Sequence, residues 1–240
     1  KGEQAYILQL DDKRIIFLIP YLDKYTLIGT TDHEVKSYDN PKITDIEKKY
    51  LISSVNKFIK NKITEDNIIW TYSGVRPLVE DLSENASKIT RDYTFEIDDK
   101  DAPILTVFGG KLTTFRKLSE HALDKISKYI KISNKSWTGN KILPGGEKTT
   151  DLNFLIPEGI LPRLIKTYGH KITKLNQYYQ GFNHGGEHIF NDLYEFEIKY
   201  LVLEEMAKTS EDILFRRTKL GINFPKEKLP NLENILKKYL

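Results

Sequence analysis

Two arginines stand in local sequences that restrict their surroundings and could bind an anion. Arg76 precedes a proline in the run IIWTYSGVRPLV, which biases its backbone towards an extended conformation. An arginine in such an apolar and aromatic run needs an anionic partner if it is buried. That partner is a ligand or a nearby carboxylate such as Glu80 or Asp81, and both interpretations are open. Arg91, in ITRDY, has the same two interpretations, with Asp92 as the nearby carboxylate.

A pair of glycines followed by Lys111 forms a second candidate site. Residues 102–130 begin as a short apolar run, break at the glycine pair 109–110 and continue with apolar residues at helical spacing. This pattern predicts a buried strand, a glycine turn and a helix. A helix start offers backbone N–H groups and a positive dipole end, to which Lys111, Thr113 and Thr114 add a cation and two hydroxyls. An ordinary strand-to-helix junction, with glycines that only allow tight packing, is the competing interpretation.

The elements that must position these residues start with an antiparallel meander. Three apolar runs, at 6–8, 15–19 and 25–28, are separated by breaks short enough for hairpins. The last run leads into GTTD at 29–32, which places a polar tip on a hydrophobic strand. We therefore expect a small sheet that carries polar side chains at one end.

A helix and an extended segment follow the meander. Thr44 is expected to cap the helix, and Glu47 completes a capping box. The predicted buried face of this helix comprises Ile46, Tyr50, Val55, Phe58 and Ile59. The run 68–79 is predicted to be extended, and Gly74 marks a bulge or a close approach of another backbone.

After residue 130 the sequence changes character. Residues 134–146 are polar and glycine-rich and end in LPGG, which predicts a linker between domains. Strand patterns are absent from residue 151 onward. Helices are expected at 161–168, 171–179, 193–206, 211–219 and 232–240, with Gly169 between the first two and Thr209 or Ser210 capping the fourth. The pattern predicts a small helical domain at the C-terminus.

The composition excludes several classes of protein. The 240 residues carry 37 basic and 34 acidic side chains, mixed along the chain, which is typical of a solvated surface and not of a nucleic-acid-binding protein. Cysteine is absent, which rules out disulfides and thiolate chemistry and favours an intracellular protein. The longest apolar run, 15–22, is far shorter than the ~20 residues of a spanning helix. Because the chain starts with Lys1 and shows no signal peptide, we expect a piece of a longer protein.

Other chemistry-bearing residues carry weaker signals. His184 and His188 have a spacing that suits metal ligands on a helix, but the two glycines between them argue against a helix, so exposed loop histidines are expected. His33 and His121 are expected to be hydrogen-bonded or exposed. No GxGxxG, GxxxxGK[ST], HExxH or GxSxG motif occurs, and no metal site is predicted.

Several blocks, read in order, resemble one family of flavoenzymes. They are IGTTD (28–32), IIWTYSGVRPL (68–78), ITRDYTFEID (89–98), APILTVFGGKLTTFRKLSEHALDK (102–125) and LPGG (143–146). Together they resemble the C-terminal portion of the FAD-dependent, quinone-linked glycerol-3-phosphate dehydrogenases. Residues 199–221 are similar to the C-terminal helical domain of that family.

The resemblance implies an α+β, mixed fold. Part of a substrate-binding antiparallel sheet and of an FAD-binding domain would be followed by an all-α C-terminal domain. The expected parts are the end of the substrate-binding domain (1–101), the strand, glycine turn and helix that return to the FAD domain (102–133), a linker (134–150) and the helical domain (151–240). Because the GxGxxG turn of the family is absent from the chain, we expect these residues alone to bind FAD weakly or not at all and to be inactive.

The resemblance also implies site residues and partners. It places Arg76, Arg91 and Lys111 at the substrate, and it places Gly109, Gly110, Lys111, Leu112, Thr113 and Thr114 at the flavin. No catalytic residue is assigned, because the candidate proton acceptors of the family precede Lys1. Glycerol 3-phosphate and quinone are the implied reactants, with no nucleic acid. A cytoplasmic protein, peripheral on the inner face of the cell membrane, is expected, and a homodimer is compatible with the sequence.

Two other functions stay open at this stage. A related flavin amine or amino-acid oxidase shares the return through strand, glycine pair and helix, although two arginines suit a phosphate better than a single carboxylate. Alternatively, the chain is a non-catalytic module whose helical domain docks on a membrane or a partner. A packed helical cap with no partner of its own is favoured over that module.

Overall fold

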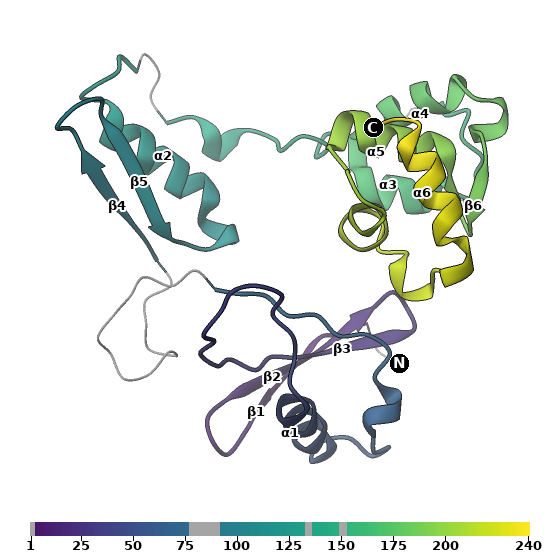
Figure 1. The fold of residues 1–240 in the computed structure, drawn as a ribbon, viewed down its shortest axis with the longest axis horizontal. Coiled ribbons are helices and arrows are strands. Elements are labelled where there is room, and N and C mark those ends of the chain that lie inside the picture. Colours follow the sequence, from purple (N-terminus) through teal and green to yellow (C-terminus); the bar gives the residue numbers. More distant parts are fainter. Residues whose placement is uncertain (1–2, 77–91, 133–135, 149–152) are drawn as a thin grey trace. The chain divides into compact units, whose positions relative to one another are not determined.

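The computed structural model describes residues 3–76, 92–132, 136–148 and 153–240 of the chain. The chain divides into two compact units, Lys1–Gly139 and Asn140–Leu240 (Figure 1). Each unit has its own buried apolar cluster. The first unit combines strands and helices and the second is mainly helical, which confirms the predicted fold class. Within the described ranges, no helix is long and apolar enough to cross a membrane.

The first unit starts with the predicted antiparallel meander. The three strands β1 (Tyr6–Gln9), β2 (Ile15–Tyr21) and β3 (Tyr25–Gly29) pair in the order β1-β2-β3 (Figure 1). Ile16 in β2 is fully buried, and it belongs to the same apolar cluster as Leu51 and Val55 of the following helix. Hydrophobic burial between this helix and one face of the sheet therefore fixes the first part of the fold.

The helix α1 (Asp45–Asn56) begins as the sequence predicts. Thr44 Oγ1 accepts a hydrogen bond from the backbone N–H of Glu47, and Glu47 Oε2 accepts one from the backbone N–H of Thr44 at 2.8 Å. This reciprocal pair is the expected capping box.

The predicted buried face of α1 is correct at three of its five positions. Three residues pack in or against the apolar cluster: Tyr50, Val55 and Ile59. Ile46 and Phe58 are instead exposed, by 82% and 50%. Ile46 precedes the buried Leu51 by five residues and is rotated from it by about 140° on a helix of 3.6 residues per turn. Phe58 and Ile59 both lie beyond the last helical residue, Asn56, and of the two only Ile59 packs against the cluster.

The segment after α1 passes through a short 3-10 turn, Glu65–Asn67, to the run 68–76. Ile68 has an extended backbone, and the run pairs with no strand among the described residues, while positions 77–79 of the predicted extended run lie outside them. The rings of Trp70 and Tyr72 stack on each other at 5.2 Å instead. A Cβ added to Gly74 would meet no atom of the described residues within 4 Å, so no other described backbone approaches it closely.

A hairpin and a helix complete the described part of the first unit. The strands β4 (Tyr93–Asp98) and β5 (Ile104–Gly109) are antiparallel, and α2 (Phe115–Ile126) follows them through a 3-10 turn, Leu112–Thr114 (Figure 1). The predicted order of strand, glycine turn and helix is confirmed, but the strand is not buried among the described residues, because Ile104, Val107 and Phe108 are 61%, 41% and 40% exposed. The α-helix starts at Phe115, one short turn later than the glycine pair suggested.

Glu120 binds the chain beyond α2 to this helix. Its carboxylate is largely buried and accepts hydrogen bonds from Ser136 and Thr138 and from Arg116 Nη1, the last at 3.1 Å. The hydrogen bonds from Ser136, Thr138 and Lys117 lower the pKa of Glu120 to about 2. The start of the short 3-10 turn Thr138–Asn140 is thereby tied to α2.

The second unit is built around one buried helix. Its helices are α3 (Leu161–Tyr168), α4 (Ile172–Gln180), α5 (Glu195–Glu205), a π-helix (Asp212–Arg217) and α6 (Leu229–Lys237). Short 3-10 turns lie at Gly169–Lys171, Asn183–Gly185, Gly221–Asn223 and Lys226–Lys228. Residues on nearly every face of α5 are buried, so it is the centre of the unit and not an amphipathic surface helix.

Most helical predictions for this unit are confirmed, with shifts at the ends. The expected helix 232–240 starts earlier, at Leu229, with Pro230 in its first turn, a position that suits proline. Thr209, and not Ser210, accepts the capping hydrogen bond from the Asp212 backbone N–H at 3.1 Å. The strands β6 (His188–Phe190) and β7 (Leu193–Tyr194) form a small hairpin that the sequence analysis did not anticipate.

Part of the LPGG segment packs on the helical unit. The His170 backbone N–H donates to the Gly145 carbonyl at 2.9 Å, and a Cβ on Gly169 would lie 2.1 Å from that same oxygen. Gly145 and Gly169 both have positive φ angles, 88° and 56°. Only a glycine at position 169 allows this approach. The hydrogen bond from His170 makes Gly145 part of the helical unit.

Candidate functional site

The first candidate site is a groove of about 1140 Å³ in the first unit. It is lined by β2 and β3, by the loop 30–35, by the start of α1 and by the run 67–76. We name it the arginine groove, because Arg76 stands at the end of the run that lines it. Ligand sites in proteins are typically concavities of this size or somewhat smaller, with an apolar wall and a few polar groups.

Arg76 contacts a carboxylate that the sequence analysis did not name as its partner. Its Nη1 lies 2.6 Å from Oδ2 of Asp32, the last residue of the GTTD tip. The two side chains are 39% and 45% exposed, so the pair lies at the water-accessible margin of the groove. The carboxylates considered from the sequence, Glu80 and Asp81, lie outside the described residues. The polar tip on a hydrophobic strand was the signal that could have identified Asp32.

Glu47 ties the Asp32 loop to α1. Its Oε1 accepts a hydrogen bond of 2.5 Å from Thr31 Oγ1 and lies 3.1 Å from His33 Nδ1, while its Oε2 serves the helix cap at Thr44. Burial of this carboxylate raises its pKa, but the hydrogen bonds from Thr31 and Thr44 and the nearby His33 outweigh that effect and lower the pKa to about 2. Glu47 is therefore ionised at neutral pH and can hold both segments.

The second candidate site is the turn 109–114 between β5 and α2. Gly109 and Gly110 have φ angles of 71° and 99°, which lie in the region that favours glycine. A Cβ on Gly110 would lie 3.2 Å from Leu118 Cδ1, so a side chain there would have to displace the end of this leucine. The interpretation of tight packing therefore applies to Gly110. It does not exclude binding, because Leu112 in the same turn is 89% exposed.

The side chains of the turn have defined partners. Thr114 Oγ1 donates to the Lys111 carbonyl at 2.9 Å and accepts from the Lys111 backbone N–H at 3.3 Å, so this hydroxyl closes the turn. Lys111 Nζ lies 3.7 Å from Asp92 Oδ1 and is about half exposed. Lys111 and Thr113 both lie at the surface. The first N–H groups of a helix have no partner within the helix, so this turn can present donors to an anionic group.

The predicted site residues fall on different parts of the chain. Arg76 belongs to the described range 3–76, and Lys111 and the glycine pair belong to the range 92–132. Arg91 lies outside the described residues. Grouping these residues into one site is therefore part of the proposal below.

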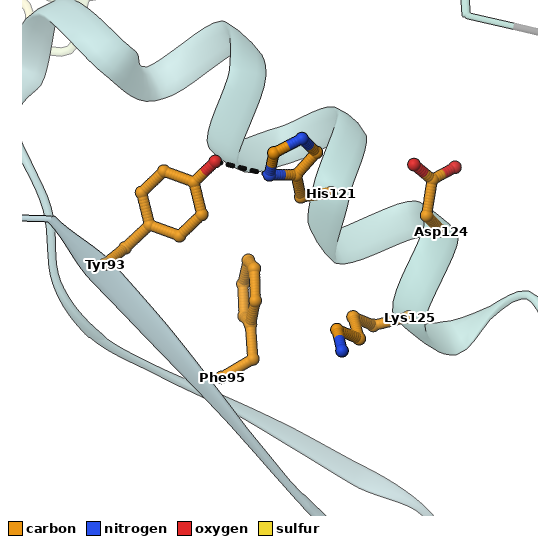
Figure 2. A pocket seen from close by; sticks show the side chains of 5 residues that line it. All are labelled: Tyr93, Phe95, His121, Asp124 and Lys125. Carbon is orange, nitrogen blue, oxygen red and sulfur yellow. Dashed lines mark hydrogen bonds between the residues drawn. The ribbon is translucent and has the colours of Figure 1, made fainter.

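A smaller hollow of about 320 Å³ lies between the hairpin and α2, where Tyr93 and Phe95 of β4 face His121, Asp124 and Lys125 (Figure 2). Tyr93 Oη and His121 Nδ1 are 2.5 Å apart, as the dashed line in Figure 2 marks. His121 is thus the hydrogen-bonded residue that the sequence analysis favoured. It joins β4 to α2.

The remaining histidines do not form a metal site. His184 and His188 are both exposed, and His188 Nε2 lies 2.5 Å from the Asn191 carbonyl. Among the described residues no group of three potential ligands could hold a metal ion.

Two family models match the chain in sequence order. Residues 1–116 match the model described as FAD dependent oxidoreductase, and residues 136–238 match the C-terminal domain of alpha-glycerophosphate oxidase. Together the two matches extend over most of the chain.

Individual relatives agree with these matches. The chain is 42% identical to the aerobic glycerol-3-phosphate dehydrogenase of Escherichia coli, over 92% of this chain and 46% of that protein. It is 39% identical to the D-erythritol 1-phosphate dehydrogenase of Brucella abortus, over 91% and 46%. The chain spans about half the length of the curated relatives it matches.

A solved structure supports the fold. The glycerol-3-phosphate dehydrogenase from Bacillus halodurans, solved in complex with FAD, aligns with a TM-score of 0.68 at 23% identity. The alignment covers 98% of this chain and 53% of that chain. At this level of identity the likeness concerns the fold alone.

Proposed function

Because the chain belongs to the FAD-dependent glycerol-3-phosphate dehydrogenases and corresponds to the C-terminal portion of its relatives, we propose that the whole protein oxidises sn-glycerol 3-phosphate to dihydroxyacetone phosphate. FAD is its cofactor and quinone its electron acceptor. The observation that carries this proposal is the match of both family models, in order, to residues 1–116 and 136–238. Relatives named glycerol-3-phosphate dehydrogenase support the substrate.

Arg76 is the residue to which we assign the substrate phosphate. A phosphate monoester carries close to two negative charges at neutral pH, and the planar fork of a guanidinium suits its oxygens better than a point charge does. Arg76 Nη1 contacts Asp32, and the guanidinium has four further N–H donors. Its position at the margin of the arginine groove leaves room for an anion. Arg91 and Lys111 are assigned to the same substrate by family position.

The turn 109–114 is the part of this chain that we assign to the flavin. The residues fit an electron-rich ring edge, because a helix start and the Lys111 cation lie at an exposed turn. When bound, the flavin supplies the acceptor for the hydride of the secondary alcohol. The residues of the turn then orient the ring and stabilise negative charge at its edge. The chain has no GxGxxG turn, so the pyrophosphate is assigned to the portion that relatives carry outside the match.

Quinone as acceptor implies a membrane surface. Quinones dissolve in the bilayer, so an enzyme that reduces them must reach its boundary. We propose a cytoplasmic protein that is peripheral on the inner face of the cell membrane, and a homodimer is compatible with this arrangement. Flotation of the full-length protein with lipid vesicles tests the location. A protein that stays in the dense fraction at every lipid composition contradicts it.

The central experiment compares the full-length protein with residues 1–240. With glycerol 3-phosphate and a redox dye, we expect dye reduction and stoichiometric FAD in the full-length protein. The 240 residues alone are expected to contain little FAD and to be inactive, because the pyrophosphate turn is missing. A full-length protein that holds FAD but does not reduce dye with glycerol 3-phosphate contradicts the function. Stoichiometric FAD in the 240 residues contradicts only the expected loss of FAD from the piece, and dye reduction by the piece contradicts only its expected inactivity.

A second substrate of the same class follows from one relative. The Brucella abortus relative is named for D-erythritol 1-phosphate, which also joins a phosphate monoester to a polyol. Comparing kcat/KM for the two phosphates, and the thermal shift of the full-length protein with each of them and with free amino acids, separates the candidates. A shift only with amino acids would favour the flavin amine or amino-acid oxidase.

The non-catalytic alternative concerns the helical unit. Several of its surface charges are already paired within the unit, for example Lys174 Nζ with Glu204 Oε2 at 2.5 Å and Lys171 Nζ with Glu205 Oε1 at 2.6 Å. Internal pairing of this kind supports a packed cap. Co-sedimentation of residues 140–240 with anionic vesicles is the test, and we expect the protein to stay in the supernatant.

A further inference from the structure

Glu47 uses its two carboxylate oxygens for two different parts of the chain. Oε2 accepts from the backbone N–H and from Oγ1 of Thr44, both at 2.8 Å, which completes the helix cap. Oε1 is not needed for a capping box, yet it accepts from Thr31 Oγ1 at 2.5 Å and contacts His33. The carboxylate is 15% exposed. A partly buried acceptor with this many donors holds its partners in fixed positions.

The two loop residues that Glu47 binds are the neighbours of Asp32. Thr31 and His33 flank it directly, and the Asp32 carboxylate contacts Arg76 Nη1 at 2.6 Å. The arginine groove is lined by all five of these residues: Thr31, Asp32, His33, Glu47 and Arg76. A continuous set of polar contacts therefore leads from the start of α1 through the loop to the guanidinium.

Arg76 itself depends on such support. Its side chain is 39% exposed, and a long side chain with that freedom loses considerable rotamer entropy when it is fixed on a ligand. A loop that already holds Asp32 in place orders the guanidinium before an anion arrives, and such preorganisation increases affinity.

We propose that Glu47 is a positioning residue for anion binding by Arg76, acting through Thr31 and Asp32. This inference rests on the proposed function for its kinetic consequence, whereas its structural consequence stands independently. Removing the bond between Glu47 and the loop lets Asp32 move and disorders Arg76, while α1 stays capped. Substrate affinity then falls and the chemical step is retained.

Two isosteric variants separate this role from simple stability. Thr31→Val removes the hydroxyl that donates to Oε1 of Glu47. Thr44→Val removes the hydroxyl that donates to Oε2 of the same carboxylate. The first readout is the Nε–Hε NMR signal of Arg76 in the 240-residue chain without ligand. We expect Thr31→Val to increase the hydrogen exchange of this group with water and Thr31→Ser to restore it. Thr44→Val is expected to lower the melting temperature and to leave this signal unchanged.

The second readout is kinetic and uses the full-length protein. We expect Thr31→Val to raise KM for glycerol 3-phosphate about fivefold, the effect of losing one hydrogen bond, with kcat within about twofold of wild type. In an Arg76→Lys background, Thr31→Val should not raise KM any further, because both substitutions act on the same contact.

The outcomes distinguish the two proposals. An Arg76 signal unaffected by Thr31→Val, or one affected equally by Thr44→Val, overturns the positioning role. A KM that is the same in wild type and in Arg76→Ala overturns the assignment of Arg76 to substrate, and the NMR comparison then still decides whether Glu47 orders Arg76. Additive effects of Thr31→Val and Arg76→Lys on KM would also contradict a path through Arg76.

Discussion

Arg76 and Asp32 are 44 residues apart in the sequence and 2.6 Å apart in the structure. The need of Arg76 for an anionic partner could be predicted, because the surrounding run is apolar and aromatic. The identity of that partner could not be predicted, since the contact depends on how the loop after β3 packs against the run 68–76. The same limit applies to Glu47. Its capping box is local and was predicted, but its bond to Thr31 joins residues 16 apart and was not.

Replacing Arg76 with lysine tests the guanidinium fork. We expect Arg76→Lys in the full-length protein to raise KM for glycerol 3-phosphate by about tenfold or more, because a point charge cannot form the paired bonds of the fork. Steady-state kinetics measure the effect. Arg14→Lys is the matched control, since Arg14 is exposed and pairs locally with Asp12. Equal KM values for the two variants would contradict the role of Arg76.

Glu47 gives the first unit a defined pH dependence. The pKa of Glu47 is lowered to about 2 in the folded chain, so its contribution to stability is complete above its ordinary pKa, near 4.5, and is lost as the pH falls towards 2. We expect wild type to be more stable than Glu47→Gln at pH 7 and this difference to shrink between pH 4.5 and 3. Urea unfolding across this range measures it. A difference that does not change with pH would show that the carboxylate charge does not contribute.

At the scale of elements, short local patterns predicted the strands and helices reliably, but they did not predict which face of a helix is buried. The meander, the cap of α1 and the order of strand, glycine turn and helix follow from hydrophobic spacing and turn residues within short windows. Ile46 was misplaced because a helical pattern does not reveal which arc of α1 meets the sheet. The hairpin of β6 and β7 was missed because strands of three and two residues are too short to show a period.

Gly110 tests the turn between β5 and α2. We expect Gly110→Ala to destabilise the first unit by about 1–2 kcal/mol, because its φ of 99° is strained for a residue with a Cβ and because the new methyl group would press on Leu118. Chemical denaturation measures the change in the free energy of unfolding. Gly74→Ala is the control and should be nearly neutral, since nothing lies within 4 Å of a Cβ there.

At the scale of the whole molecule, each of the two units has its own apolar cluster. The apolar cluster of the second unit includes residues from α3 to α6. This unit could be predicted as helical because the helical spacing is repeated along its length. The ion pair in its interior could not be predicted, because Arg163 and the fully buried Glu197 are 34 residues apart in the sequence. In the structure two hydrogen bonds of 2.9 and 2.6 Å join them.

The buried pair provides a test of the helical unit. Residues 140–240 are expected to fold alone and to melt cooperatively. Arg163→Met should destabilise this unit by about 3–5 kcal/mol, because Glu197 would remain as a buried charge without its guanidinium. Arg216→Met, which removes an exposed arginine with two carboxylate partners, should change stability by at most about 1 kcal/mol. Similar melting temperatures for the two variants would contradict the buried pair as a stabilising contact.

Among the described residues the hairpin of β4 and β5 pairs with no further strand, and Ile104, Leu112 and Phe115 on or beside it are 61%, 89% and 51% exposed. Unpaired strand edges beside exposed apolar side chains are templates for aggregation. A solution of these 240 residues should therefore become turbid with rising concentration unless a mild detergent or another polypeptide shields the hairpin. Light scattering across a dilution series would reveal this behaviour, and purification at low concentration follows as the practical choice.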